Sequence, residues 1–452
     1  GTAHAGRAAM AEDASVVFYN PAAMTELDRA QMTAGFTYIN GVGDFDGNGT
    51  NAGGGAITGA DDTDVYSDGG NYLGESFIPF FYYARPIDEK FSVGLGIYVP
   101  FGTNTDYDND FVGGGFADET SLMSLEIAPT FAYKVNDQLS IGGGIDIVYM
   151  EGLLSKYVDS VPYRADLDYA VNVLGQDPAT YGITAASPLL DSDNAGFENH
   201  YEVEGDDWGY GWNLGAYYKL SDMTTLGLTY RSEIEITLEG DSKFAESFVA
   251  YDDTTDTVVP YGNIRSQASE VPLTTPASAT LSLVHQLTDQ LLLQAGATWT
   301  GWSSFKSFDV IATENISDAT PDISDISYDG GDGLDLGYIG HIDESWTDVW
   351  ALALGGTYQL NDRMVLRAGY AYDQSPVDDA HRTARVPSSD RQWLTLGAGY
   401  VVDANLSVDV AAGYLFMNPM DLSEQNKKND NTYTESKTSV TGEYEIDVTN
   451  VT

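Results

Sequence analysis

Alternating apolar and polar positions recur along the chain as pairs of runs joined by short polar turns. Six such pairs span Ser76 to Phe101, Leu122 to Met150, Gly209 to Leu238, Ala279 to Trp302, Val349 to Tyr372 and Trp393 to Met417. The turns at their centres are Asp88-Glu89, Asn136-Asp137, Ser221-Asp222, Thr288-Asp289, Asn361-Asp362 and Asp403-Ala404. Alternation with a period of two around a short polar turn predicts antiparallel β-hairpins.

Two further alternating runs, Met32 to Asn40 and Ser439 to Val451, have no hairpin partner. Six hairpins and two single strands make fourteen strands, and bacterial single-chain barrels have an even number. About ten residues rising roughly 3.3 Å each, tilted by about 40°, cover the roughly 25 Å apolar band of an outer membrane. The pattern therefore predicts an all-β fold, a 14-stranded antiparallel transmembrane β-barrel built from residues 31–452.

The connections between hairpins are long, Gly-rich and acidic, unlike the short turns within them. The longest are expected at about Gly152 to Asp206, Gly240 to Pro276 and Lys306 to Ser345. Short turns on one rim and long loops on the other are typical of outer-membrane barrels, whose long loops face the exterior. A soluble sandwich or propeller would space its turns more evenly.

The alternation also predicts which side chains share a face of the barrel wall. In the strand after Ser221-Asp222 we expect Arg231 in the lumen and the apolar side chains toward lipid. That lipid-facing set is Leu226, Leu228, Tyr230, Ile234, Ile236 and Leu238. Inward glycines such as Gly142 and Gly397 leave room for something inside the barrel.

Residues 1–30 break the alternating pattern. Small residues dominate as far as Ala14, and the run that contains Phe18, Asn20, Pro21 and Ala22 does not alternate. Proline also cannot donate a ladder hydrogen bond in a lipid-facing strand. Because fourteen strands enclose more space than their own side chains fill, we expect residues 1–30 to form a hatch that plugs the lumen.

Composition excludes several classes of function. The chain has 69 Asp plus Glu against 20 Lys plus Arg, a net charge of −49, which argues against nucleic acid as a partner. It has no Cys, so disulfides and thiolate metal sites are excluded. No stretch approaches about 18 consecutive apolar residues, so a helical membrane protein is excluded. The five His are scattered, and without a catalytic motif we expect no enzyme and no cofactor.

Two regions carry specific motifs: Asn20-Pro21-Ala22, preceded by Gly1-Thr2-Ala3-His4-Ala5-Gly6, and the stretch from Ile78 to Tyr83 with Val93 to Gly102. Together they resemble the long-chain fatty-acid transporter family of Gram-negative outer membranes, the FadL type, which includes aromatic-hydrocarbon uptake proteins. The resemblance implies capture near the outer loops, an apolar pocket in the lumen and sideways release at a kink in the third strand. That strand is Phe91 to Phe101 here, and we expect a lateral gate at Gly94, Gly96, Pro100 and Gly102. Alternatively, Pro100 merely ends the strand.

The second strand is apolar on both faces and is a candidate wall of the ligand pocket. If Arg85 points inward, the lumen is lined by Phe77, Phe81 and Tyr83, which with Tyr98 make candidate ligand contacts. The alternative is that these rings pack against the hatch.

Two cations are expected in the lumen. Arg367 and Arg231 could meet a fatty carboxylate. Pairing with inward acids such as Asp146, Asp409 or Glu12 is favoured, because an unpaired buried charge is costly.

Asp44, Asp46 and Asn48 have the spacing of the first half of a calcium loop, but the twelfth position is Gly55 rather than Glu. Weak loop-bound calcium is one interpretation, and a solvated acidic loop is the other. A second acidic cluster contains Asp325, Asp329, Asp332 and Asp335.

The sequence thus predicts a monomeric barrel in the bacterial outer membrane, in contact with lipopolysaccharide. Its predicted substrate is a long-chain fatty acid, with aromatic or alkane hydrocarbons as the alternative. From a different class of function, the chain could be a surface-binding or adhesion barrel that acts through its loops.

Overall fold

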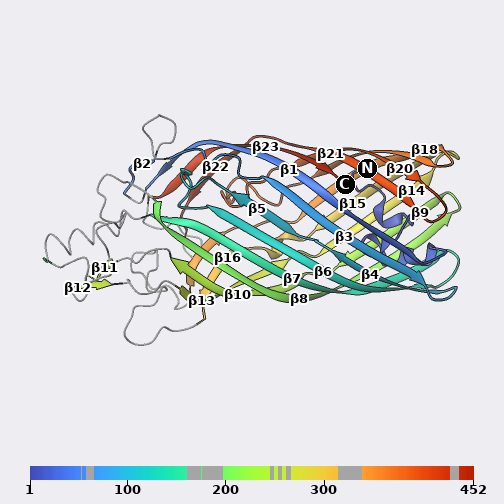
Figure 1. Cartoon of the computed structure of the whole chain (residues 1–452), viewed down its shortest axis with the longest axis horizontal. Helices are drawn as coiled ribbons and strands as arrows, with labels where there is room; N and C mark the ends of the chain where they lie inside the picture. Colours follow the sequence, from blue (N-terminus) through green and yellow to red (C-terminus); the bar gives the residue numbers. More distant parts are fainter. Residues whose placement is uncertain are drawn as a thin grey trace.

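The computed structural model describes residues 1–51, 53–57, 66–159, 175, 197–244, 249–252, 257–260, 266–313, 338–427 and 437–452. Within them, fourteen antiparallel strands form one barrel (Figure 1). Eight run without interruption: β1 (Gln31–Thr50), β3 (Glu75–Pro86), β6 (Glu119–Lys134), β7 (Leu139–Asp159), β8 (Phe197–Ser221), β19 (Met364–Asp373), β20 (Arg391–Val401) and β23 (Ser439–Val451). Six consist of two segments: β4 (Phe91–Tyr98) with β5 (Gly102–Asp106), β9 (Thr224–Arg231) with β10 (Ile234–Phe244), β13 (Ser266–Thr275) with β14 (Ser278–Gln286), β15 (Leu291–Thr300) with β16 (Ser307–Ala312), β17 (Tyr338–Asp343) with β18 (Val349–Asn361), and β21 (Ser407–Met417) with β22 (Met420–Gln425).

The last strand closes the barrel on the first. β23 pairs with β1 from Val451 opposite Tyr38 to Ser439 opposite Thr50. Closure leaves no sheet edge to expose unpaired backbone groups to lipid. The predicted 14-stranded antiparallel barrel is confirmed. Short β2 (Ala56–Ile57) pairs with the end of β1, and β11 (Val249–Asp252) pairs with β12 (Thr257–Pro260).

All six predicted hairpin turns are present. Their leading Asn or Asp side chain often holds the turn, as where Asn136 Oδ1 accepts the backbone N–H groups of Gln138 and Leu139, each over 2.9 Å. On the opposite rim the loops are shorter than predicted, since β7 continues to Asp159 and β8 starts at Phe197. Those outer strand ends carry polar outward side chains, so no apolar alternation marks them in the sequence.

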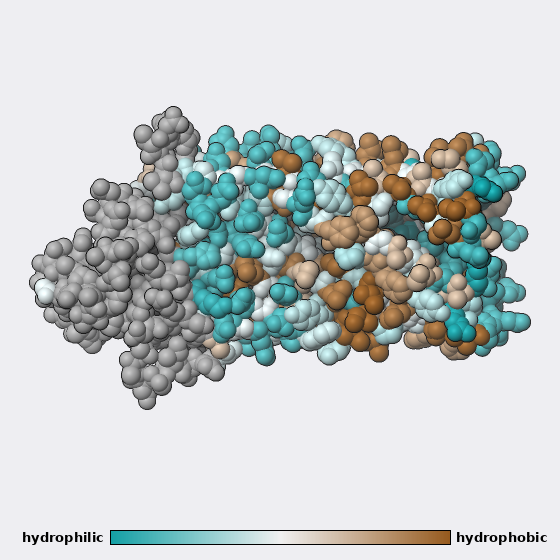
Figure 2. Space-filling view, in the orientation of Figure 1, coloured by the Kyte–Doolittle hydropathy of each residue, from teal (hydrophilic) through white to brown (hydrophobic). Residues whose placement is uncertain are grey.

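Figure 2 shows the reason on the visible face: apolar residues gather on the half of the barrel near the short turns, and polar residues cover the other half. Exposed apolar side chains of the first half include Leu214, Leu281, Leu354 and Leu396. This belt matches the lipid-facing band of an outer-membrane barrel. In the described part of the chain, no helix is long and apolar enough to cross a membrane.

The seventh wall strand reverses its faces at its interruption. β9 places Leu228 outward, as predicted. Farther along, the six residues 207–212 of β8 lie opposite the seven residues 232–238 of the seventh strand. The seventh strand therefore carries one extra residue here. An extra residue reverses the alternation that follows it. The side chains turned into the barrel, against our prediction that they face lipid, are Ile234, Ile236 and Leu238.

The first thirty residues lie inside the barrel near the rim of short turns (Figure 1). They contain three short helical segments, η1 (Arg7–Ala9), α1 (Val16–Tyr19) and η2 (Pro21–Glu26). Wall glycines face them all around: Gly94, Gly142, Gly215, Gly227, Gly296, Gly355, Gly369 and Gly397. A Cβ at Gly227 would lie only 1.9 Å from the Ala8 carbonyl oxygen. The segment's backbone therefore rests directly on the wall.

Replacing Gly227 with Val should displace the N-terminal segment, because the added Cβ would overlap backbone that cannot move aside locally. We expect the ion conductance of the protein in planar bilayers to rise several-fold. Gly340→Val is the matched control, since a Cβ there would meet its nearest atom at 3.7 Å, an ordinary contact. Equal conductance of the two variants would contradict the packing described here.

Candidate substrate cavity and lateral window

The third wall strand is interrupted where the sequence predicts a kink. β4 and β5 both pair with β6, but between them Val99, Pro100 and Phe101 lie opposite only Ser124 and Leu125. Ser124 Oγ donates to the Phe101 carbonyl over 2.6 Å and accepts its N–H over 3.0 Å. The third strand thus carries a proline-containing bulge, and it continues beyond Pro100 instead of ending there.

On the side of this bulge that is nearer the long loops, the wall lacks strand pairing. β3 pairs with β4 as far as Phe81 and Ile97, and among the described residues no strand pairs with residues 75–80 on that side. Contact resumes higher up, where the Asp106 N–H donates to the Tyr72 carbonyl over 2.9 Å. We call the region between these two contacts the lateral window.

The predicted gate residues divide between two roles. Pro100 and Gly102 lie at the bulge, but Gly94 and Gly96 belong to the regular ladder below it. A Cβ at Gly94 would lie 2.5 Å from Val17, so this glycine makes room for the N-terminal segment. Gly94 and Gly96 thus lie below the bulge, and their part in a lateral gate stays a prediction.

The aromatic face of β3 is opposite to the predicted one. Phe77 is 62% exposed and stacks on Phe36, with ring centroids 4.4 Å apart, on the outside of the barrel. Alternation puts Phe81 and Tyr83 on that same outer face, so Arg85 does not point inward. The inward side chains are Ile78, Phe80 and Tyr82. Alternation groups residues by face but does not say which face is the lumen.

Aromatic rings do meet below the window, on the inner side. Phe18 of α1 lies 4.6 Å from the ring of Tyr98, edge to face, and 6.4 Å from the ring of Tyr82. Tyr98 is buried. Tyr98 therefore lies on the inner side of the wall in contact with the N-terminal segment, and its contact with a ligand stays a prediction.

Asn20, Pro21 and Ala22 fix that segment. Asn20 donates its side-chain amide to the carbonyls of Ala8, over 2.6 Å, and Ala216, over 3.0 Å. Its Oδ1 caps η2 by accepting the Ala22 N–H over 3.1 Å. Pro21 begins η2, where its missing N–H costs nothing. The motif therefore joins two parts of the segment to the wall.

A buried ionic cluster holds α1 in place. Arg231 donates to Glu126 over 2.9 Å, to Asp146 over 3.3 Å and to the Phe18 carbonyl over 3.1 Å. Its guanidinium lies 4.7 Å from the centre of the Phe18 ring. Tyr98 also hydrogen-bonds to Glu126. The pairing of Arg231 with inward acids is confirmed, and Glu126 is a partner that the sequence analysis missed.

Arg367 is likewise paired. It contacts Asp409 over 2.6 Å and Glu12 of the N-terminal segment over 3.2 Å. The predicted structural pairing is confirmed, and these two carboxylates leave the predicted ligand contact of Arg367 without support.

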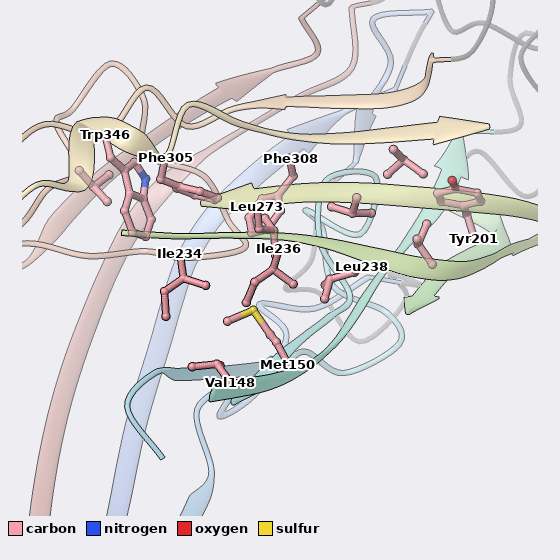
Figure 3. Close-up of a cluster of buried hydrophobic side chains, with 14 of the residues drawn as sticks. Val148, Met150, Tyr201, Ile234, Ile236, Leu238, Leu273, Phe305, Phe308 and Trp346 are labelled. Atoms are coloured by element: carbon pink, nitrogen blue, oxygen red, sulfur yellow. The ribbon is translucent and has the colours of Figure 1, made fainter. Parts of the chain in front are cut away.

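An apolar cavity lies in the lumen above the N-terminal segment. It encloses only about 20 Å³ of free space, so an acyl chain would have to displace part of the lining to enter. Figure 3 shows the buried cluster that contains the lining residues Leu238, Leu273 and Phe308; Ile236 of β10 points toward Met150 of β7 in the same cluster. The apolar lining residues are Leu122, Leu153, Leu154, Val203, Leu238, Val271, Leu273 and Phe308. One of these lining residues, Leu238, faces the lumen only because β10 reverses its faces. The prediction that Leu238 faces lipid therefore could not reveal this cavity.

A buried positive charge lies beside the cavity. Residues 374–390, which connect β19 to β20, fold inward and place Arg385 in the lumen, 2% exposed. Arg385 donates to Thr120, which lines the cavity, over 3.3 Å. Its Nε is buried and has no hydrogen-bond partner among the described residues. The sequence analysis missed Arg385, although the run from His381 to Arg385 has unusual positive charge for so acidic a chain.

Two carboxylates and a lysine surround Arg385. Glu424 accepts the Ala384 N–H over 2.8 Å, and Glu344 accepts Trp346 Nε1–H over 2.8 Å and the Thr383 hydroxyl over 3.2 Å. Burial raises the pKa of Glu344 to about 8, so this group is mostly neutral at pH 7. Lys156 acts electrostatically on Arg385 and Glu424. Burial also raises the pKa of Glu424 to about 7, and Asp118 is a third carboxylate that acts on Arg385, so Arg385 and Lys156 lie among acids of which Glu344 is mostly neutral at pH 7.

The predicted calcium loop is a strand. Asp44, Asp46 and Asn48 lie on one outward face of β1, with Asp44 and Asp46 paired across to Glu445 and Glu443. An extended strand does not wrap oxygen ligands around one ion as a loop does. Among the described residues, no group of three or more His, Asp or Glu is placed to hold a metal. The second acidic cluster, Asp325, Asp329, Asp332 and Asp335, lies outside the described residues.

Sequence comparison finds relatives along nearly the whole chain. The family model described as outer membrane protein transport protein (OMPP1/FadL/TodX) matches residues 1–451. The long-chain fatty acid transport protein of Escherichia coli is 28% identical over 416 residues, 92% of this chain and 84% of that relative. Outer membrane protein P1 of Haemophilus influenzae is 30% identical over 428 residues, 92% of this chain and 83% of that relative.

Solved structures share the architecture. The crystal structure of a Pseudomonas aeruginosa FadL homologue has a TM-score of 0.79 at 26% identity, with 100% of this chain and 95% of that chain covered. The Pseudomonas putida toluene transporter TodX has a TM-score of 0.60 at 18% identity, with 97% and 93% covered. At that lower identity, the likeness to TodX shows the fold alone.

Proposed function

The chain belongs to the outer membrane protein transport family of OMPP1, FadL and TodX, and on that premise we propose that it takes up long-chain fatty acids. The family places it in the outer membrane as a transporter of hydrophobic molecules, not an enzyme. We propose capture at the outer loops, binding in the apolar cavity and release through the lateral window. Residues 1–30 serve as a hatch that blocks the axial route. We also propose that the barrel is a monomer in contact with lipopolysaccharide, and its closure of β23 on β1 within one chain supports the monomer.

One observation carries the choice of a fatty acid over a hydrocarbon. Among the residues that the structure describes, the buried Nε–H of Arg385 has no hydrogen-bond partner, and it lies beside an apolar cavity. A buried donor without a partner is costly, and a carboxylate would satisfy it with a charge-assisted hydrogen bond. A neutral hydrocarbon would leave it unpaired. The site thus fits a molecule with an acyl chain and an anionic head.

Replacing Arg385 with Gln tests this choice. We expect the affinity for oleate to fall by about tenfold or more, since a charged hydrogen bond contributes about 1.5–3 kcal/mol. Binding should be measured by calorimetry on the purified chain in detergent. Arg363→Gln, at an exposed short turn, is the matched control. Equal oleate affinity in both variants, with an uncharged hydrocarbon displacing oleate, would favour hydrocarbon uptake instead.

Ligand affinity should also depend on pH through Glu344. Because the pKa of Glu344 is raised to about 8, this group is neutral below pH 8 and ionises as the pH rises through that value. The ionised carboxylate then competes for Arg385, so anion affinity should fall by a few-fold from about pH 6.5 to 9.5. A long-chain alkanesulfonate is the suitable probe because its head group stays ionised throughout. Glu344→Gln should reduce the dependence without removing it, because burial raises the pKa of Glu424 to about 7 and lowers that of Lys156 to about 8, so both titrate in the same range. An unchanged slope in that variant would contradict the assignment.

A further inference from the structure

The apolar cavity and the lateral window are linked by a continuous series of aromatic rings. Phe308 lines the cavity and lies 4.8 Å from Phe305, which lies 4.8 Å from Trp346. Trp346 lies 4.9 Å from Trp302, and Trp302 lies 6.1 Å from Phe101. All four contacts are edge to face, with interplanar angles from 69° to 77°.

The last of these contacts crosses the lumen. Phe101 belongs to the bulge of the third wall strand, at the window. Trp302 lies in η6 (Trp302–Ser304), which interrupts the ninth wall strand between β15 and β16. Six strand positions separate the third and ninth strands in a ring of fourteen. These two rings can therefore meet only across the interior of the barrel.

The rings differ in how much space surrounds them. Phe305, Phe308 and Trp346 are buried, and Figure 3 shows Phe305 beside Trp346. Trp346 is further fixed by its hydrogen bond to Glu344. Trp302 and Phe101 are only partly buried. The series is thus anchored at the cavity and more open toward the window.

We propose that Trp302 and Phe101 form the release path along which the acyl chain passes from the cavity to the lateral window. The inference rests on the proposed function and deepens it. An acyl chain forms no hydrogen bonds, so it moves most favourably along a surface where each apolar contact that it loses is replaced by the next one. Trp302 provides the step between the cavity wall and the window, and Ser124 holds the backbone of Phe101 at its end.

The test compares binding with transport in the full chain. Trp302→Leu keeps apolar bulk but removes the ring. It should leave oleate affinity within about twofold and slow uptake by at least about fivefold, the size expected for losing one ring contact. Uptake is measured with labelled oleate in cells that lack their own transporter. Trp302→Phe should restore more than half of the rate. Trp350→Leu, an exposed tryptophan on the outer face, is the matched control.

Phe101→Leu serves as a second variant if Trp302→Leu does not fold, and the same loss of uptake is expected. Uptake within about twofold of the unaltered chain in either folded variant, with oleate binding intact, would overturn the release path. Failure of the proposed function gives a different result, because the unaltered chain itself would then fail to bind oleate.

Discussion

Deleting Pro100 should slow fatty-acid uptake by at least about tenfold while leaving oleate affinity unchanged. The deletion removes the extra residue opposite Ser124 and Leu125, so the third strand can pair without a bulge. Its straightened backbone would then meet residues 75–80 of β3, whose hydrogen-bonding groups lack a strand partner on that side in the described chain. A continuous ladder leaves no sideways route for an acyl chain.

The chain supplies a matched control for this deletion. In the thirteenth wall strand, residues 417–419 lie opposite only residues 445 and 446, which is again a bulge of one residue, and Pro419 is part of it. Deleting Pro419 should leave uptake within about twofold if oleate affinity is unchanged, because the thirteenth strand does not border the lateral window. Oleate affinity is measured first, since Glu424 of the following segment accepts the N–H of Ala384, next to Arg385. If both deletions slow uptake equally, or if neither does, the lateral window is not the exit.

Replacing Arg231 with Met should lower the free energy of unfolding by about 3–5 kcal/mol. The substitution keeps the apolar stem but leaves Glu126 and Asp146, with side chains 3% and 2% exposed, without their cation. It also removes the donor to the Phe18 carbonyl. Unfolding in denaturant, followed by tryptophan fluorescence in detergent, provides the measurement.

A rescue variant separates charge from packing. In the Arg231→Met background, adding Glu126→Gln and Asp146→Asn removes the uncompensated carboxylates. Most of the lost stability should return, because removing a whole buried ion cluster costs far less than breaking it. A loss below about 1 kcal/mol in the single variant would mean that the cluster does not hold α1 to the wall.

The sequence predicts the barrel well because its determinants are local. Alternation and an Asn or Asp at each turn act over a few residues, as at Asn136, and fourteen strands follow from counting them. The Asn20-Pro21-Ala22 segment is likewise marked by its lack of alternation. The paired states of Arg231 and Arg367 follow from the cost of burying an unpaired charge.

The proposed substrate site escaped prediction because it depends on contacts between residues far apart in the sequence. One additional residue in the seventh strand reverses Ile236 and Leu238 into the lumen, and the sequence does not show which residues of β8 lie opposite. The same uncertainty of face put Phe77 on the wrong side of the wall. Arg385 lies on a connection between strands, where no periodicity indicates that the chain folds inward.

The most direct test of the account is a crystal structure of the protein with a fatty acid brominated near the middle of its chain. Anomalous scattering then locates the bromine atoms. We predict bromine inside the cavity between Leu238 and Phe308, with the carboxylate on Arg385. Bromine found only on the outer apolar belt, or a carboxylate directed away from Arg385, would contradict the account.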